Sequence, residues 1–133
     1  MNEKQGNPTV SHEDAKCVVK HMCRDMGVPE IRCFFETKHS DLRGEYVPGV
    51  CIVFYGGVRL STVLHELAHH VHESRKSGVI KAHNLTFHRI CFEVRDVFRS
   101  LYGYDALKVS GPYVNTIAYE KALNEWFETR RAS

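Results

Sequence analysis

The sequence has no run that approaches the roughly 18 consecutive apolar residues of a membrane-spanning helix, so it predicts a protein without a membrane partner. Residues 1–9 are polar and lack the apolar centre of a secretory signal, which predicts a cytoplasmic protein. Repeats and low-complexity stretches are also missing from the chain. The formal net charge is only +2, which is too small to require a nucleic-acid partner.

Cysteine is present, but not in the spacing of a zinc ribbon or a redox motif. The five cysteines are odd in number and scattered, and no two of them form a C-x-x-C pair. Cys17, Cys51 and Cys91 fall within apolar patterns, which predicts that their side chains are buried. This use of cysteine favours a reducing, cytosolic compartment.

The length and composition are those of one globular domain. The chain has 133 residues, of which 43% are hydrophobic and 26% charged, and this is enough apolar material to form a core. We expect a flexible N-terminal tail at residues 1–10 and a single domain at residues 11–133.

The first half of the chain predicts one helix followed by strands. Ser11 is expected to cap a helix with helically spaced apolar residues, and Gly27 is expected to end it. Residues 31–37 and 50–55 are rich in β-forming side chains and predict two strands. Residues 42–47, between them, fit either a further strand or a loop.

The second half predicts three helices. The first runs from Ser61, as its N-cap, to about residue 76, and the second follows Asn84 with an apolar stripe at helical spacing. A last helix is expected at about residues 115–130. We therefore predict an α+β fold in which a small antiparallel or mixed sheet packs against helices, because helical crossovers between the strands are missing.

Residues 65–69 read His-Glu-Leu-Ala-His, the H-E-x-x-H motif. His65 and His69 are four residues apart on a predicted helix, so their imidazoles project from the same face and can reach one Zn²⁺ ion. Glu66 lies beside the first ligand, where its carboxylate can take a proton from zinc-bound water without ligating the metal. The motif predicts a zinc-dependent hydrolase with Glu66 as its general base.

A catalytic zinc site needs a third protein ligand and an open fourth position. His83 is our candidate, because it follows a loop and directly precedes the amphipathic helix. His72, His88 and Glu93 remain alternatives for this third position. His70 points away from the face of the two motif histidines, and we expect it to be structural or solvated.

The segments Thr62-Val63-Leu64-His65-Glu66-Leu67-Ala68-His69 and His83-Asn84-Leu85-Thr86-Phe87 resemble the SprT-like zinc metallopeptidases and, more broadly, minimal zincin domains. The resemblance covers roughly residues 11–102. It implies that His83 is the third zinc ligand, that Phe87 packs the following helix against the site, and that the substrate is a protein or peptide.

The chain departs from that family in two ways. Asn84 replaces the usual glycine, although Asn tolerates a left-handed backbone better than most residues. The zinc ribbon that follows the catalytic domain in many relatives is missing. Spartan-type members cleave proteins crosslinked to DNA, and without the ribbon a DNA partner has only weak support here.

A second feature consistent with DNA binding is a group of six basic residues near the motif: Arg75, Lys76, Lys81, Arg89, Arg95 and Arg99. Acidic residues are interleaved with them, which favours a solvated, salt-bridged face over a DNA groove.

Two other functions remain open. One is a repressor-cleaving protease of the ImmA/IrrE type, which has an acidic third ligand, such as Glu93. The other is a non-catalytic interaction domain stabilised by zinc, although structural zinc sites usually close with four ligands, often thiolates.

Overall fold

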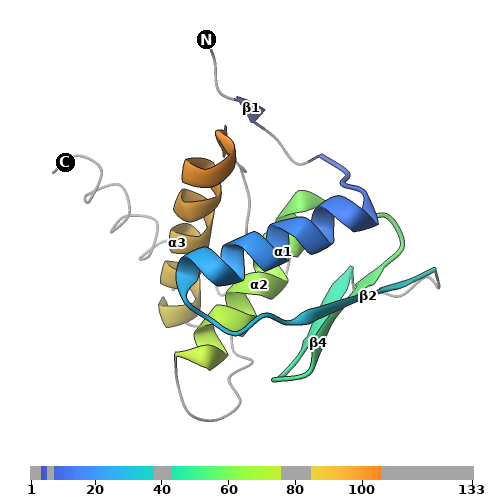
Figure 1. Ribbon diagram of the computed structural model, residues 1–133, viewed down its shortest axis with the longest axis horizontal. Coiled ribbons are helices and arrows are strands. Elements are labelled where there is room, and N and C mark those ends of the chain that lie inside the picture. Colours follow the sequence, from blue (N-terminus) through green and yellow to red (C-terminus); the bar gives the residue numbers. More distant parts are fainter. Residues whose placement is uncertain (1–3, 6–7, 38–42, 76–84, 106–133) are drawn as a thin grey trace, which may run out of the picture.

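The computed structural model of the chain describes residues 4–5, 8–37, 43–75 and 85–105 (Figure 1). Within these ranges a helix is followed by a small mixed sheet and then by two further helices, so the predicted α+β class is confirmed. His83 and the helix predicted at residues 115–130 lie outside the described residues. None of the described helices combines the length and the apolar character needed to cross a membrane.

Helix α1 (His12–Met26) has the ends that the sequence predicts. The hydroxyl of Ser11 accepts a hydrogen bond from the backbone N–H of Asp14 at 3.0 Å, which satisfies one of the free donors of the first turn. Gly27 ends the helix in the left-handed conformation at φ 67°, and the N–H of Val28 donates to the carbonyl of Cys23 at 3.0 Å. The N–H of Gly27 also donates to the carbonyl of Arg24 at 3.3 Å, and the two bonds at this end form a Schellman motif.

The sheet contains β2 (Arg32–Glu36), β3 (Gly44–Val47) and β4 (Cys51–Tyr55) in the order β2-β4-β3. Strand β4 pairs parallel with β2 and antiparallel with β3, so the sheet is mixed. The segment left open as strand or loop therefore forms a strand at the sheet edge.

A three-residue turn joins β3 to β4. The N–H of Val50 donates to the carbonyl of Val47 at 2.9 Å, and Gly49 has φ 69°. Pro48 before this glycine gives the Pro-Gly centre of a type II turn, which requires positive φ at its third position. The turn reverses the chain so that β4 lies in the middle of the sheet.

Helix α2 (Leu60–Ser74) begins two residues earlier than predicted, and the prediction of Ser61 as its N-cap is wrong. Arg59 is the N-cap and makes no side-chain capping bond. The N–H of Leu60 instead donates to the carbonyl of Pro8 at 2.9 Å, and the N–H of Val10 donates to Val58 at 2.8 Å. Part of the segment predicted as a tail is thus paired with the start of α2.

Helix α3 (Leu85–Tyr102) packs on α2 through its predicted apolar stripe. Phe87, Val94 and Phe98 are buried, whereas Leu101 at the end of the stripe is exposed. Beyond it, β5 (Tyr104–Asp105) pairs parallel with β1 (Lys4–Gln5).

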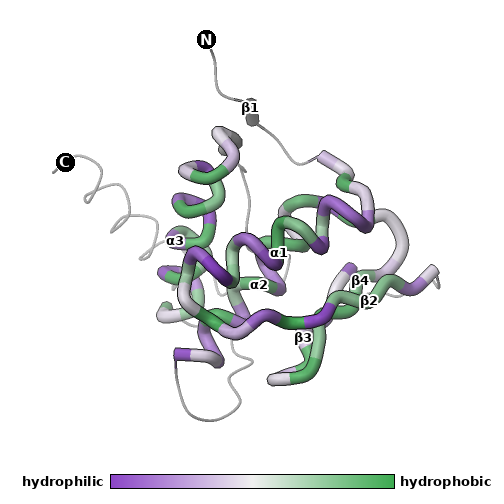
Figure 2. Tube along the Cα trace, in the orientation of Figure 1, coloured by the Kyte–Doolittle hydropathy of each residue, from purple (hydrophilic) through white to green (hydrophobic). Residues whose placement is uncertain are grey.

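Helix α2 lies between α3 and the sheet, and α1 crosses in front of it in Figure 1. Every position from 63 to 72 in α2 is buried, and its apolar side chains form much of the core. Figure 2 shows hydrophilic positions along α1, which exposes one face to solvent.

The cysteine predictions are confirmed in part. Cys51 and Cys91 are buried, but Cys17 is exposed, so the prediction of a buried Cys17 is wrong. The buried face of α1 contains Ala15, Val18 and other residues at helical spacing, and position 17 points away from that face.

Candidate metal centre

His65 and His69 lie side by side on α2, one helical turn apart. Their ring centroids are 4.9 Å apart, the planes meet at 85°, and each residue is 8% exposed. Two imidazoles from the same helix face, close together and nearly enclosed, fit two positions of a zinc site.

The ring of Phe87, from the first turn of α3, packs against both motif histidines. Its centroid lies 5.3 Å from that of His65 and 4.3 Å from that of His69, on which it stacks at 23°. Because Phe87 is fully buried, it restricts both imidazoles to the orientations in which the helix presents them.

Glu66 lies between these two histidines in sequence and is 7% exposed. Burial raises the pKa of its carboxyl to about 7, and the negative charge of Glu45 acts in the same direction. A backbone hydrogen bond from Tyr46 on β3 opposes this shift by stabilising the carboxylate. The side chain can therefore exchange a proton near neutral pH.

Strand β3 approaches α2 unusually closely at Gly44. A Cβ atom added there would lie 2.8 Å from Cγ2 of Thr62 and 3.1 Å from Cγ of Glu66. Contacts this short force a shift of the strand or helix, so glycine permits the approach that places β3 beside the Glu66 carboxylate.

The third ligand predicted by sequence, His83, is outside the described residues. Among the described residues, no three His, Cys, Asp or Glu side chains are arranged to hold a metal ion. His72 and His88 are fully buried, and the ring of each lies near Phe87. The third ligand therefore stays a prediction.

Glu93, the acidic alternative, is already engaged. Its two carboxylate oxygens accept hydrogen bonds from Nη1 and Nη2 of Arg75 at 2.7 and 2.6 Å. This bidentate pairing lowers the pKa of Glu93, and using its carboxylate as a metal ligand would weaken the pair. The same contact favours the salt-bridged interpretation of the basic residues near the motif.

His70 has a structural role, in line with one of our two expectations. Its Nε2 donates to the carbonyl of Pro29 at 2.6 Å, and its Nδ1 lies 3.3 Å from the hydroxyl of Tyr46. Sequence reasoning did not select Tyr46, because nothing in its local pattern reveals that β3 will lie beside α2.

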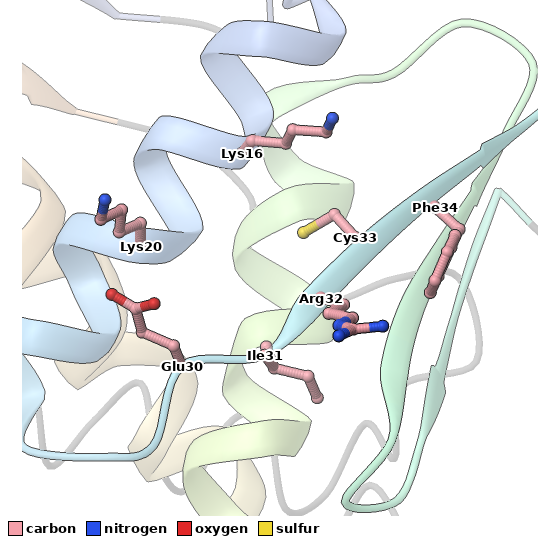
Figure 3. A pocket seen from close by; sticks show the side chains of 7 residues that line it. All are labelled: Lys16, Lys20, Glu30, Ile31, Arg32, Cys33 and Phe34. Atoms are coloured by element: carbon pink, nitrogen blue, oxygen red, sulfur yellow. The ribbon is translucent and has the colours of Figure 1, made fainter.

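A separate hollow of about 320 Å³ lies between α1 and β2 (Figure 3). Its lining includes Lys16, Lys20, Arg32 and Cys33, and no residue of α2 contributes to it. Burial raises the pKa of Cys33 to about 11, so its thiol is protonated at neutral pH and is a weak nucleophile. The hollow thus offers no counterpart to the chemistry of α2.

Comparisons of the chain with protein-family models, with curated proteins and with solved structures found no match. Two adjacent imidazoles supply two of the ligands that a zinc site needs, and a buried carboxyl with a pKa near neutrality can move a proton.

Proposed function

We propose that the protein is a zinc-dependent hydrolase that cleaves peptide bonds, with His65, His69 and His83 as zinc ligands and Glu66 as general base. The observation that carries the proposal is the buried Glu66 carboxyl on the same helix as two adjacent imidazoles that share one face. The resemblance of residues 62–69 and 83–87 to SprT-like peptidases supports a peptide as the substrate. Membership of that family and a cytoplasmic location are part of the same proposal.

The residues of the site have distinct tasks in this reaction. A zinc ion held by neutral imidazoles supplies Lewis acidity, which acidifies water and polarises a carbonyl group. Glu66 accepts the proton of the attacking water and passes it to the leaving amine. With a pKa of about 7, its carboxyl can both accept and release that proton near neutral pH.

The buried Glu66 also supports an enzyme over a domain that zinc merely stabilises. An ionised carboxyl is costly to bury, and a structural zinc site gains nothing from such a group beside its ligands. The engagement of Glu93 by Arg75 likewise gives the SprT-like interpretation more support than the ImmA/IrrE type.

Zinc content and hydrolysis test the proposal together. Wild-type protein should bind one zinc ion and cleave members of an unstructured peptide library, and Glu66→Gln should retain the zinc but lose about 10²-fold or more in kcat. His65→Ala and His83→Ala should lose the metal, whereas Glu93→Gln, the matched control on α3, should keep it. Wild-type turnover by zinc-loaded Glu66→Gln would contradict the mechanism.

The inactive Glu66→Gln variant can be used to identify the natural substrate. Glu66→Gln with bound zinc should retain a protein substrate that the wild type releases as fragments. Mass spectrometry of co-purifying proteins, with the His65→Ala variant as the metal-free control, identifies candidates whose cleavage by the wild type is then measured directly.

A further inference from the structure

The hydroxyl of Tyr46 connects β3 with α2 and with the β3–β4 turn. It donates to Oε1 of Glu73 at 2.7 Å, accepts from the N–H of Gly49 at 3.1 Å, and lies 3.3 Å from Nδ1 of His70. Burial, reinforced by the neighbouring Glu73, raises the pKa of Tyr46 to about 12, so the hydroxyl keeps its proton.

The backbone N–H of Tyr46 is directed towards Glu66, the candidate general base. The N–H of Tyr55 donates to the carbonyl of Arg43 at 3.0 Å, so residue 43 faces β4. Because the direction alternates along an antiparallel strand, the N–H of Tyr46 points to the outer side of β3. There it bonds to the carboxylate of Glu66.

The ring of Tyr46 lies against a proposed zinc ligand. It is nearly parallel to the ring of His69, with an interplanar angle of 8° and centroids 6.4 Å apart. Tyr46 is 7% exposed, so its ring is held in the core. One residue thus contacts the proposed base through its backbone and a proposed ligand through its ring, and its hydroxyl is anchored to α2.

We propose that Tyr46 is a positioning residue whose anchored hydroxyl holds β3 against α2 and thereby fixes the Glu66 carboxylate and the His69 ring for hydrolysis. This inference rests on the proposed function. Outer partners of metal ligands orient them, and the loss of such a partner typically lowers metal affinity or activity about 10- to 100-fold. Tyr46 contacts both the proposed base, Glu66, and the proposed ligand, His69.

The decisive variant is Tyr46→Phe, which keeps the ring and the backbone N–H and removes only the hydroxyl. We expect zinc affinity, measured by competition with a chromogenic chelator, to fall about tenfold. We expect kcat on the best library peptide to fall by a similar factor while KM stays unchanged. Tyr102→Phe is the matched control, because its hydroxyl joins α3 to His21 of α1 and touches neither α2 nor β3.

Substitutions at Glu73 test the same hydrogen bond from its other end. Glu73→Gln retains an oxygen that accepts the Tyr46 hydroxyl and should preserve zinc affinity and kcat, whereas Glu73→Ala should match Tyr46→Phe. The double variant Tyr46→Phe/Glu73→Ala should be no worse than either single variant, because the two changes break the same bond.

Amide hydrogen exchange at residue 46 tests the same anchoring in metal-free protein. The amide should be protected in the wild type and in Tyr102→Phe, and it should exchange faster in Tyr46→Phe.

Two kinds of failure are distinguishable. A wild type that binds no zinc and cleaves no peptide contradicts the proposed function, and with it the role of Tyr46 in positioning groups for hydrolysis. If the wild type is active but Tyr46→Phe lowers only the melting temperature, with zinc affinity, kcat and exchange at residue 46 unchanged, the positioning role is overturned.

Discussion

At the scale of single residues, the buried carboxyl of Glu66 makes the stability of the fold depend on pH. Its pKa is about 7 in the folded protein, compared with 4.5 for an ordinary glutamate, so the folded state binds the proton more tightly than the unfolded state. The stability gained from this proton is fully present below about pH 4.5 and is lost as the pH rises through about 7. A shift of this size corresponds to about 3 kcal/mol.

We therefore expect Glu66→Gln to stabilise the metal-free protein at alkaline pH. The difference in unfolding free energy between variant and wild type should grow from near zero at about pH 4 to about 3 kcal/mol at about pH 8. Urea unfolding across this range, with chelator present, measures it. Parallel pH profiles for the two proteins would show that Glu66 titrates normally.

The cysteines should differ sharply in reactivity. Burial raises the pKa of Cys23 and of Cys33 to about 11, so at pH 8 only about one thiol in a thousand is ionised at each position. Cys17 is exposed on α1. Iodoacetamide at pH 8 should therefore modify Cys17 first, as followed by peptide mass spectrometry. Unfolded protein serves as the control, in which all positions should react at similar rates.

The sequence predicted the site where its residues are close along the chain. The spacing of His65 and His69 places them on one helix face without any knowledge of the fold. Tyr46 reaches the site only because β3 lies beside α2, and that arrangement depends on the whole sheet. The exposure of Cys17 was within reach of sequence analysis, because helical spacing from Ala15 and Val18 already excludes it from the buried face.

At the scale of helices and strands, the capping bond of α1 provides a direct test. Ser11→Ala removes the acceptor for the N–H of Asp14 and should lower the unfolding free energy by about 1 kcal/mol. Ser100→Ala is the control, because Ser100 is exposed within α3 and its loss should stay within about 0.5 kcal/mol. Equal effects of the two changes in denaturant unfolding would contradict a capping role for Ser11.

Helix positions were predictable from periodicity, and helix ends only where the type of the capping residue itself determines the end. Ser11 and Gly27 bound α1 through their own chemistry, so the sequence reveals them. At the start of α2, a backbone carbonyl from Pro8 satisfies the N–H of Leu60, and no side-chain rule contains that information. The sequence did not decide whether the residues of β3 form a strand or a loop, because four residues carry too little pattern to separate the two.

At the scale of the whole molecule, the segment at residues 8–10 matters for stability. Deleting residues 1–10 removes the hydrogen bonds from Leu60 to Pro8 and from Val10 to Val58, as well as the packing of Val10 on the core. The loss should be about 2 kcal/mol relative to a protein that lacks only residues 1–7. Thermal unfolding of the two truncated proteins measures this difference, and equal stability would show that the pairing contributes little.

The strand order also belongs to this scale. The missing helical crossovers predicted an antiparallel or mixed sheet, and the sheet is mixed. Which strand lies in the middle was not predictable, because the chain forms the edge strand β3 before it forms the central strand β4. The buried Ile52 and Phe54 of β4 fit its central place, but short apolar strands at an edge and in the centre look alike in sequence.

The enclosure of α2 by α1, α3 and the sheet has a thermodynamic consequence. Because packing already restrains His65, Glu66 and His69, their rotamer entropy is lost during folding and not when a ligand arrives. Binding at this helix should thus proceed with little rearrangement of these three side chains. A helix built this way is preorganised, and the same core that makes the domain stable also sets the geometry of its chemistry.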